Sequence, residues 1–270
     1  MAADTPDPTV TEPPARRHWA GKGSLLRELP VLLVVSVVLA VLIKTFLVQP
    51  FYIPSGSMER TLHGCPGCVA DRILVTKPPY WFGDPEPGDI VVFRGPDTWA
   101  PEVVVEEPSN WVGGALRWVG RTIGIAAPSE EDFVKRVIAV GGQTVQCCDP
   151  EGRVLVDGVP LDEPYIYEDT PIEMRAFGPV VVPEGRLWVM GDHRSNSADS
   201  REHIGDRWMG TVAVDDVIGK ASLIIWPLDR FGWLDDPDIQ GQAAAPPLDG
   251  GAVLLGAALL TTRPRDRARR

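Results

Sequence analysis

The hydrophobic positions of this chain form one long run near the N-terminus and a series of short runs after it. Residues 30–48 are almost wholly apolar apart from Lys44. At about 1.5 Å per residue, a helix of this length nearly crosses a hydrocarbon core about 30 Å thick. We predict a transmembrane helix, with Lys44 near its outer end, where the long side chain can reach the headgroups. A buried core helix is the alternative.

The charges before this run predict its orientation. Arg16, Arg17, Lys22 and Arg27 precede the apolar residues, and positive charges favour the cytoplasmic side. Residues 1–29 are therefore predicted as a cytoplasmic tail, and everything after the span lies outside the plasma membrane. A cleaved secretory signal is the alternative, but its apolar core usually has only about 7–15 residues. We therefore predict an uncleaved, single-pass anchor.

A second apolar run lies near the C-terminus. Residues 250–262 are apolar and precede a basic tail, residues 263–270. Such a run reaches only about 20 Å, which is short for a crossing, and Pro246, Pro247 and Asp249 oppose a longer helix. A second membrane segment and a tail that is disordered or lies on the surface both stay open.

The chain between the two apolar segments, residues 49–232, is typical of a mostly β domain. Short apolar runs alternate there with Gly, Pro and Asp turn signals. The predicted strands are residues 71–77, 89–94, 133–140, 153–159, 180–183, 186–190 and 217–226. We therefore predict a β-sheet domain outside the membrane, followed by a linker over residues 233–249.

Residues 97–132 interrupt the strand pattern as an insert. Trp111 and Trp118 are seven residues apart, so they would share one face of a helix, although Gly113 and Gly114 weaken the helix prediction. Our preferred interpretation packs this face against the domain's own core. The alternative is contact with the bilayer, because Trp favours the membrane interface.

Composition and charge exclude some classes of function. The net charge of -11 argues against nucleic-acid binding, which usually needs a basic surface. The sequence has no Gly-rich phosphate loop, zinc-binding His/Cys spacing or dinucleotide fingerprint. We therefore expect neither a cofactor nor a catalytic metal.

The four cysteines form two close pairs, Cys65 with Cys68 and Cys147 with Cys148. Outside the membrane an even number of cysteines favours disulfides, and four of them allow three pairings. A zinc site with four thiolates is the alternative, although adjacent ligands depart from the usual zinc spacing.

Lys135 is the first candidate for chemistry, because it lies inside an apolar strand pattern. Strand alternation places it on the same face as Phe133 and Val137. Apolar surroundings disfavour a charged ammonium, and a neutral amine can act as a general base. An exposed strand lysine is the alternative.

The segment Ser55-Gly56-Ser57, just beyond the membrane run, supplies a candidate nucleophile. Glycine allows close approach of backbone and ligand. One serine could attack while the other hydroxyl and a backbone N–H stabilise the oxyanion. Together with Lys135, the segment predicts a serine nucleophile with a lysine base at a membrane surface.

The same residues belong to blocks that resemble bacterial type I signal peptidases, also called leader peptidases. The matching blocks, in the family's order, are residues 53–58, 71–77, 88–93, 135–142 and 191–201. The resemblance runs from the membrane anchor to about residue 227. The paired cysteines and the 97–132 insert look like those of actinobacterial members.

The resemblance implies a catalytic role for four residues. Ser57 is the nucleophile, and Lys135 is the general base for both attack and release of the acyl-enzyme. Ser55 is a side-chain oxyanion donor beside the Ser57 N–H. The Ser197 hydroxyl orients the lysine, whose amine has no fixed hydrogen-bond direction of its own.

Supporting roles follow from the same resemblance. Asp199 and Arg201 match a structural ion pair, and Asp192 also supports the site. His193 is the obvious base for an ordinary serine–histidine site, but it occupies a supporting position in the matching block.

The family's substrates are exported preproteins, cut after a signal peptide that ends in an Ala-x-Ala-like pattern. Small residues before the cut imply shallow apolar pockets, with the substrate added as an extended strand at a sheet edge. Six residues flank the catalytic pair and could line these pockets: Ile53, Pro54, Met58, Leu62, Phe133 and Val134. The expected partners are preproteins, the lipid bilayer and the protein export translocon.

Two other classes of protein remain as alternatives. A noncatalytic membrane scaffold could keep the β domain, but it would not need both Ser57 and Lys135. A penicillin-binding type of acyltransferase should carry serine and lysine three residues apart, whereas Arg60 occupies that position after Ser57.

Overall fold

The computed structural model describes residues 25–101, 110–122, 131–167 and 176–241. It divides into two compact units, Met1–Phe46 and Leu47–Arg270. Most of the predicted cytoplasmic tail, the end of the linker, the apolar segment 250–262 and the basic tail lie outside the described residues.

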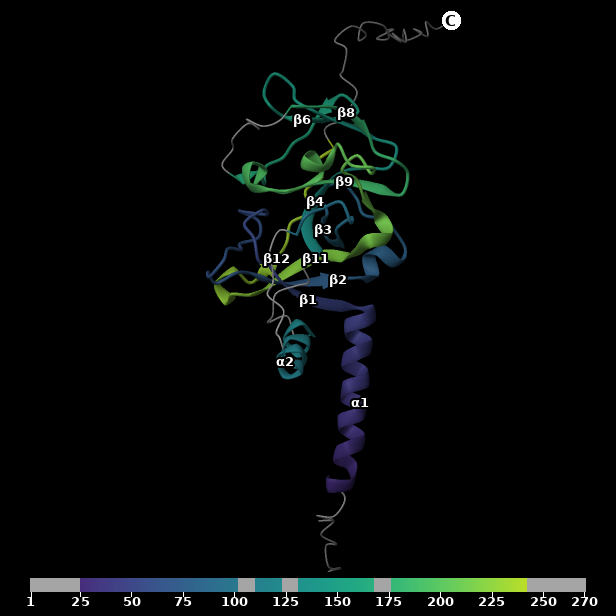
Figure 1. Ribbon diagram of the computed structural model, residues 1–270, viewed down its shortest axis with the longest axis vertical. Coiled ribbons are helices and arrows are strands. Elements are labelled where there is room, and N and C mark those ends of the chain that lie inside the picture. Colours follow the sequence, from purple (N-terminus) through teal and green to yellow (C-terminus); the bar gives the residue numbers. More distant parts are fainter. Residues whose placement is uncertain (1–24, 102–109, 123–130, 168–175, 242–270) are drawn as a thin grey trace, which may run out of the picture. The chain divides into compact units, whose positions relative to one another are not determined.

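The first unit contains helix α1 (Leu25–Phe46) (Figure 1). The predicted boundaries, 30 and 48, are both shifted. The helix begins at Leu25, so Pro30 lies inside it beyond the first turn, where the Leu26 carbonyl lacks its usual N–H partner. It ends earlier because Val48 pairs with Thr76 in a strand. The stretch Glu28–Phe46 is long and apolar enough to cross a membrane, and none of it is buried, which argues against a core helix.

The second unit is built on an eight-stranded antiparallel sheet (Figure 1). Its strands are β1 (Val48–Tyr52), β2 (Arg72–Thr76), β3 (Ile90–Arg94), β4 (Asp132–Val140), β9 (Arg186–Met190), β10 (Val212–Ala213), β11 (Val217–Trp226) and β12 (Gly232–Trp233). The order is β1-β2-β11-β3-β4-β9-β10, and β12 pairs with β11. The sheet confirms the prediction of a mostly β domain.

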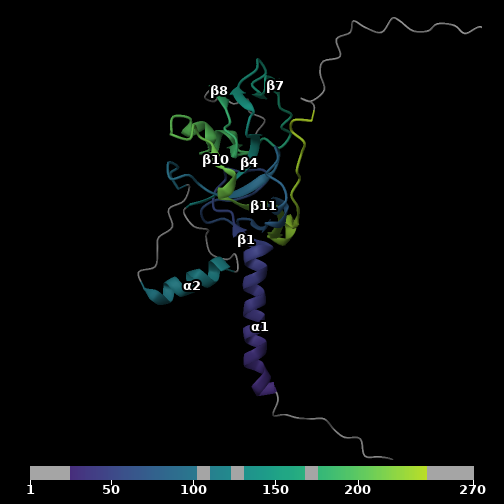
Figure 2. The same ribbon diagram turned by 90° about the vertical axis from the view of Figure 1, so that its right-hand side faces the viewer.

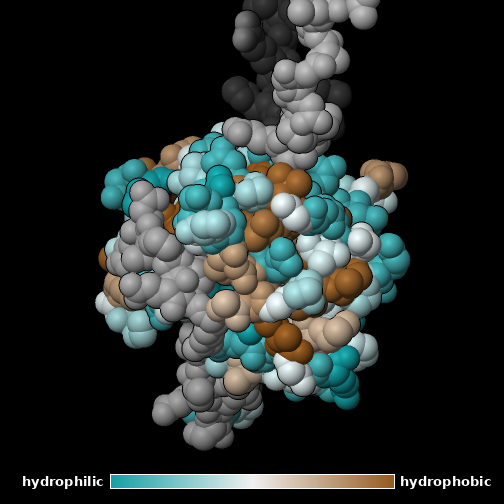
Figure 3. Space-filling view, turned by 90° about the horizontal axis from the view of Figure 1, so that it is seen from above, coloured by the Kyte–Doolittle hydropathy of each residue, from teal (hydrophilic) through white to brown (hydrophobic). Residues whose placement is uncertain are grey.

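A smaller sheet of four strands has the order β7-β6-β5-β8. Its strands are β5 (Thr144–Cys147), β6 (Val154–Val156), β7 (Val159–Pro160) and β8 (Phe177–Val181). Figures 1 and 2 both show it at the end of the domain away from β1. Seen from that end, hydrophobic residues form scattered patches between polar ones (Figure 3).

The single strand predicted over residues 153–159 is instead a hairpin. Val156 and Val159 are paired, and the two residues between them, Asp157 and Gly158, have φ values of 51° and 80°. An Asp-Gly pair accepts positive φ at both positions, which makes a two-residue turn possible.

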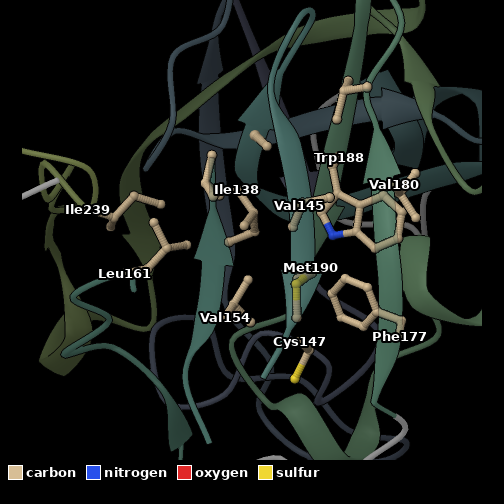
Figure 4. Packing of buried hydrophobic residues seen from close by; sticks show 13 residues of the cluster. Ile138, Val145, Cys147, Val154, Leu161, Phe177, Val180, Trp188, Met190 and Ile239 are labelled. Atoms are coloured by element: carbon tan, nitrogen blue, oxygen red, sulfur yellow. The ribbon is translucent and has the colours of Figure 1, made fainter. Parts of the chain in front are cut away.

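The core has three clusters, and two of them lie on opposite faces of β3, which is buried on both faces. Along β3, Ile90 and Val92 belong to one cluster, and Val91 and Phe93 belong to another. Successive strand side chains point to opposite faces, so each set meets a different part of the core. The third cluster joins the small sheet to β4 and β9, with Trp188 and Phe177 among its members (Figure 4).

Short 3₁₀ helices connect the strands. They are η1 (Pro78–Trp81), η3 (Arg194–Asn196), η4 (Ser200–His203), η5 (Val214–Asp216) and η6 (Leu228–Arg230). The described strands missing from the prediction are β1, of which only Val48 fell within the predicted membrane span, and the short strands β5, β10 and β12.

The insert contains helix α2 (Trp111–Thr122). The Asn110 side-chain oxygen accepts a hydrogen bond from the Gly113 N–H, 2.7 Å away, which caps the start of the helix. Trp111 and Trp118 are exposed, so the preferred interpretation that they pack against the domain's core is wrong. Their spacing predicts a shared face but carries no information on what covers that face.

Candidate active site

Ser57 lies in the loop that joins β1 to β2. The Ile53 N–H donates to the Asp71 carbonyl, at 3.0 Å, and so extends the pairing of the two strands beyond Tyr52. Met58, which follows the serine directly, and Leu62 are both buried in the core. These apolar anchors fix the backbone on the C-terminal side of Ser57.

Lys135 and Ser57 are 78 residues apart in sequence and meet in the fold. Lys135 Nζ lies 2.9 Å from Ser57 Oγ and 3.1 Å from the Val134 carbonyl oxygen. Both residues are buried, with 0% of Lys135 and 4% of Ser57 exposed. A buried amine in contact with a serine hydroxyl can take up the hydroxyl proton as the oxygen attacks a carbonyl.

Ser55 extends this group. Its Oγ lies 3.2 Å from Ser57 Oγ, and its side chain is half-buried. A hydroxyl at this position can donate to an oxyanion that forms next to Ser57.

The backbone around Ser55 is held by close packing against Gly64. A Cβ atom at position 64 would lie 2.5 Å from the Ile53 carbonyl oxygen and 2.6 Å from the Ser55 carbonyl oxygen. Only glycine allows this approach. The loop after Ser57 therefore folds back on the segment that carries the serines.

The segment after β9 packs against the nucleophile from another direction. The His193 N–H donates to the Ser57 carbonyl at 3.1 Å, and His193 Nδ1 lies 3.0 Å from the Gly56 carbonyl oxygen. A Cβ atom on Gly191 would lie 2.4 Å from the Ser57 carbonyl oxygen and 2.2 Å from Ser197 Oγ. These contacts suit His193 to positioning the serine segment.

Ser197 packs against the same side of Gly191 as that carbonyl, because one Cβ atom there would meet both oxygens. Its hydroxyl oxygen is buried and makes no hydrogen bond of ordinary geometry with the described residues, although it lies near enough to Asp199 to help lower the pKa of that carboxylate. The structure therefore brings Ser197 into the site without the predicted hydrogen bond to the lysine.

Asp199 and Arg201 form the predicted ion pair, with Nε–Oδ1 and Nη2–Oδ2 distances of 2.8 and 2.7 Å. Asp199 Oδ2 also accepts the Gly191 N–H at 2.9 Å. Burial by itself raises the pKa of Asp199, but the hydrogen bonds and charge of Arg201 outweigh it and lower the pKa overall. The pair thus fixes Gly191, which contacts Ser57.

Asp192 has a buried partner that the sequence analysis missed. Arg136 Nε and Nη2 lie 2.9 and 2.7 Å from the two carboxylate oxygens of Asp192, and the Thr61 hydroxyl donates to one of them at 2.5 Å. This cluster ties β4, the loop after Ser57 and the segment after β9 together. A signal was present, because an arginine inside an apolar strand needs a buried carboxylate partner.

The six candidate pocket residues do not form one group. Ile53, Met58 and Leu62 lie in one core cluster with the partly buried Val134 packed against it. Phe133 belongs to a different cluster, where its ring stacks on Phe93. Pro54 is half-buried beside Ser55.

The cysteine pairing is resolved by the structure. Cys65 is bonded to Cys68, and Cys147 is bonded to Cys148. All four thiols are used in this way, so the structure does not support the four-thiolate zinc alternative.

Comparison with known proteins gives the family. Residues 26–226 match the family model described as signal peptidase, peptidase S26. The chain is 51% identical to a protein named signal peptidase I of Mycobacterium tuberculosis (strain ATCC 25618 / H37Rv), over 78% of this chain and 76% of the relative. It is 46% identical to the probable signal peptidase I of Mycobacterium leprae (strain TN), covering 78% and 80%.

A more distant relative extends the match. Signal peptidase I of Leptolyngbya laminosa is 35% identical, over 88% of this chain and 98% of the relative. The matched region contains both Ser57 and Lys135. The chain therefore belongs to the signal peptidase family, peptidase S26, as a hydrolase that resembles the actinobacterial type I signal peptidases.

Proposed function

We propose that this peptidase removes N-terminal signal peptides from exported preproteins through an acyl-enzyme on Ser57, with Lys135 as general base. The observation that carries the proposal is the 2.9 Å contact between Lys135 Nζ and Ser57 Oγ in a buried setting. The names of the relatives, signal peptidase I, support the substrate class.

The chemistry has two steps. In the first, Lys135 Nζ takes the Ser57 hydroxyl proton while Oγ bonds to the scissile carbonyl carbon. The oxyanion accepts hydrogen bonds from the Ser55 hydroxyl and the Ser57 N–H. As the tetrahedral species collapses, the C–N bond breaks, the lysine returns the proton to the leaving amine, and the signal peptide stays bound as an ester.

In the second step, Lys135 removes a proton from water, which attacks the ester carbonyl. Ser57 Oγ leaves and regains a proton from the lysine, and the signal peptide is released with a free carboxylate. The same amine acts in both steps, so its loss should abolish turnover rather than slow one half of the reaction.

Part of β4 offers an edge for substrate binding. β9 pairs with β4 only from Arg136 onwards, whereas β3 pairs with it from Asp132. An extended substrate added beside residues 132–135 would present its backbone to the dyad. Val134 in this stretch and Pro54 next to Ser55 are the candidate pocket residues that keep accessible surface, and a shallow pocket suits the small residues of an Ala-x-Ala site.

Helix α1 supports a place in the plasma membrane. Its composition and length suit a single crossing, and the basic residues before it favour a cytoplasmic N-terminus with the β domain outside. Confining enzyme and substrate to one surface raises their effective concentration. The bilayer and the export translocon are the partners that this location implies.

The test is cleavage of a preprotein with an Ala-x-Ala site by the detergent-solubilised full chain. Ser57→Ala and Lys135→Met should each abolish cleavage while the circular dichroism spectrum stays that of the parent. Ser222→Ala and Lys77→Met are matched controls outside the site and should retain activity. Full activity of Lys135→Met would refute the mechanism, and a parent that is inert on several preproteins would favour a noncatalytic scaffold.

A further inference from the structure

Helix α2 exposes an unusual amount of apolar surface for its length. Its large apolar side chains are exposed to the following extents: Trp111 84%, Val112 48%, Leu116 68% and Trp118 69%. Single exposed apolar residues are common on proteins, but a group of them on one short helix marks a contact surface.

These residues share one side of the helix. At about 100° per residue, Trp118, Trp111, Val112 and Leu116 fall within an arc of about 160°. Positions 113, 114, 117, 120 and 121 fall on the opposite side, and they carry only glycine and arginine. The helix is therefore amphipathic, and its positive charges, from Arg117 and Arg121, have no acidic counterpart between residues 111 and 122.

Such a helix is not stable in water on its own. Helices shorter than about 12–15 residues are marginal even for Ala-rich sequences, and each of Gly113, Gly114 and Gly120 costs about 1 kcal/mol relative to Ala. A surface that covers the apolar side would supply the missing stabilisation.

We propose that α2 lies in the interface of a bilayer that contains anionic lipids, with Trp111, Leu116 and Trp118 toward the acyl chains. Trp favours the headgroup region, and short amphipathic helices with basic polar sides bind anionic membranes in this way. The chain as a whole carries a net charge of -11, which such a membrane repels, so the local positive charge of α2 is the feature that selects this partner. The inference rests on the proposed membrane anchorage by α1.

A second membrane contact would restrict how the catalytic domain tumbles over the surface. The polypeptide between the two contacts includes the whole segment from β1 to the insert, with Ser57 in it. The orientation of the site relative to the membrane would then depend on α2 as well as on α1.

The experiment places a single fluorophore on each side of α2 in the full-length chain. The native thiols are paired in disulfides, so Leu116→Cys and Gly114→Cys each give one thiol for an environment-sensitive nitrobenzoxadiazole label. Gly114 is the matched control, because a Cβ atom there meets nothing within 4 Å. Each labelled protein is reconstituted into vesicles of phosphatidylcholine with or without phosphatidylglycerol, and a lipid-soluble quencher reports depth.

The Leu116→Cys label should shift to shorter wavelength and be quenched at least threefold more than the Gly114→Cys label, and more strongly in vesicles with phosphatidylglycerol. The charge reversal Arg117→Glu with Arg121→Glu should remove the dependence on phosphatidylglycerol. Equal, water-like emission from both labels would overturn the inference. A shift of the Leu116→Cys label to shorter wavelength that grows with protein concentration at fixed lipid would also overturn it, because such a shift would indicate contact between copies of α2.

Two further readouts separate this inference from the proposed function. Flotation of the vesicles tests anchorage by α1, and preprotein cleavage by the same samples tests the peptidase. If the protein floats and cleaves but the Leu116→Cys label stays in water, only the α2 inference fails. If the protein does not float, the anchorage proposal fails with it.

Discussion

A substitution at Ser55 tests stabilisation of the oxyanion while the nucleophile, Ser57, stays in place. The Ser55 hydroxyl lies 3.2 Å from Ser57 Oγ, where it can donate to an oxyanion without being the nucleophile or the base. We predict that Ser55→Ala lowers kcat by about 10²–10³-fold with little change in KM, because one donor to the transition state is lost. Ser55→Thr keeps a hydroxyl and should recover most of the rate. Steady-state cleavage of a signal-peptide substrate measures both, and an unchanged kcat for Ser55→Ala would remove Ser55 from the mechanism.

A substitution at Gly191 tests how closely the segment after β9 must approach the nucleophile. Gly191→Ala would place a methyl group 2.4 Å from the Ser57 carbonyl oxygen and 2.2 Å from Ser197 Oγ. The backbone must move, so we expect a stability loss of about 1–3 kcal/mol together with a large fall in kcat. Gly178→Ala, which meets nothing within 4 Å, should leave cleavage unchanged. Wild-type kinetics for Gly191→Ala would show that this contact does not position Ser57.

The Asp199–Arg201 pair connects the segment after β9 to the site, and both partners are buried. Removing one charge leaves the other buried without its partner, which costs about 3–5 kcal/mol. We predict that Asp199→Asn lowers the free energy of unfolding by that amount in urea denaturation. Asp97→Asn removes a carboxylate from an ion pair with Arg207 in which both side chains are exposed, and it should cost no more than about 1 kcal/mol. Equal losses for the two variants would contradict the structural role of the Asp199 pair.

The lowered pKa of Asp199 also predicts the response of this pair to acid. A carboxylate whose pKa is lower in the folded protein stabilises the fold above its unfolded pKa, about 3.9. That stabilisation is lost as the pH falls through the folded pKa. Unfolding free energies measured from about pH 5 down to about pH 2 should therefore fall less steeply for Asp199→Asn than for the parent. Parallel curves would contradict this assignment.

The loop closed by Cys65 and Cys68 directly follows Gly64, which packs on the serine segment. We predict that Cys65→Ser with Cys68→Ser lowers kcat several-fold, because the loop that presses on the Ser55 backbone loses its covalent closure. The control is Cys147→Ser with Cys148→Ser, a pair at the end of β5 in the small sheet, which should leave kcat unchanged. Equal kcat values for both double variants would show that loop closure does not affect the site.

Membrane confinement is a property of the complete chain, because α1 lies in a separate unit from the catalytic domain. We predict that removing residues 1–46 lowers cleavage of a membrane-inserted preprotein by about 10²-fold or more, the range over which tethering raises effective concentration. Cleavage of a short soluble peptide with the same site should change little. Equal losses on both substrates would indicate that the shortened domain is misfolded rather than delocalised.

The sequence by itself determined the features that depend on neighbouring residues. A run of apolar residues long enough to span a bilayer predicts α1 without any tertiary contact, and alternation between turn signals predicts strands such as β4 and β11. Ser57 and Lys135 were identified from their immediate surroundings and from matching blocks. Each of these signals is local, so it survives without knowledge of the fold.

Only the tertiary structure decided which distant residues meet. The 2.9 Å contact between Ser57 and Lys135 joins positions 78 residues apart, and the cluster of Arg136, Asp192 and Thr61 joins three separate segments. The fit of Gly191 against Ser57 and the exposure of the α2 face also depend on packing. The physical reason is that a local pattern shows which side chains need burial or a partner, whereas the identity of the partner is set by how the whole sheet closes.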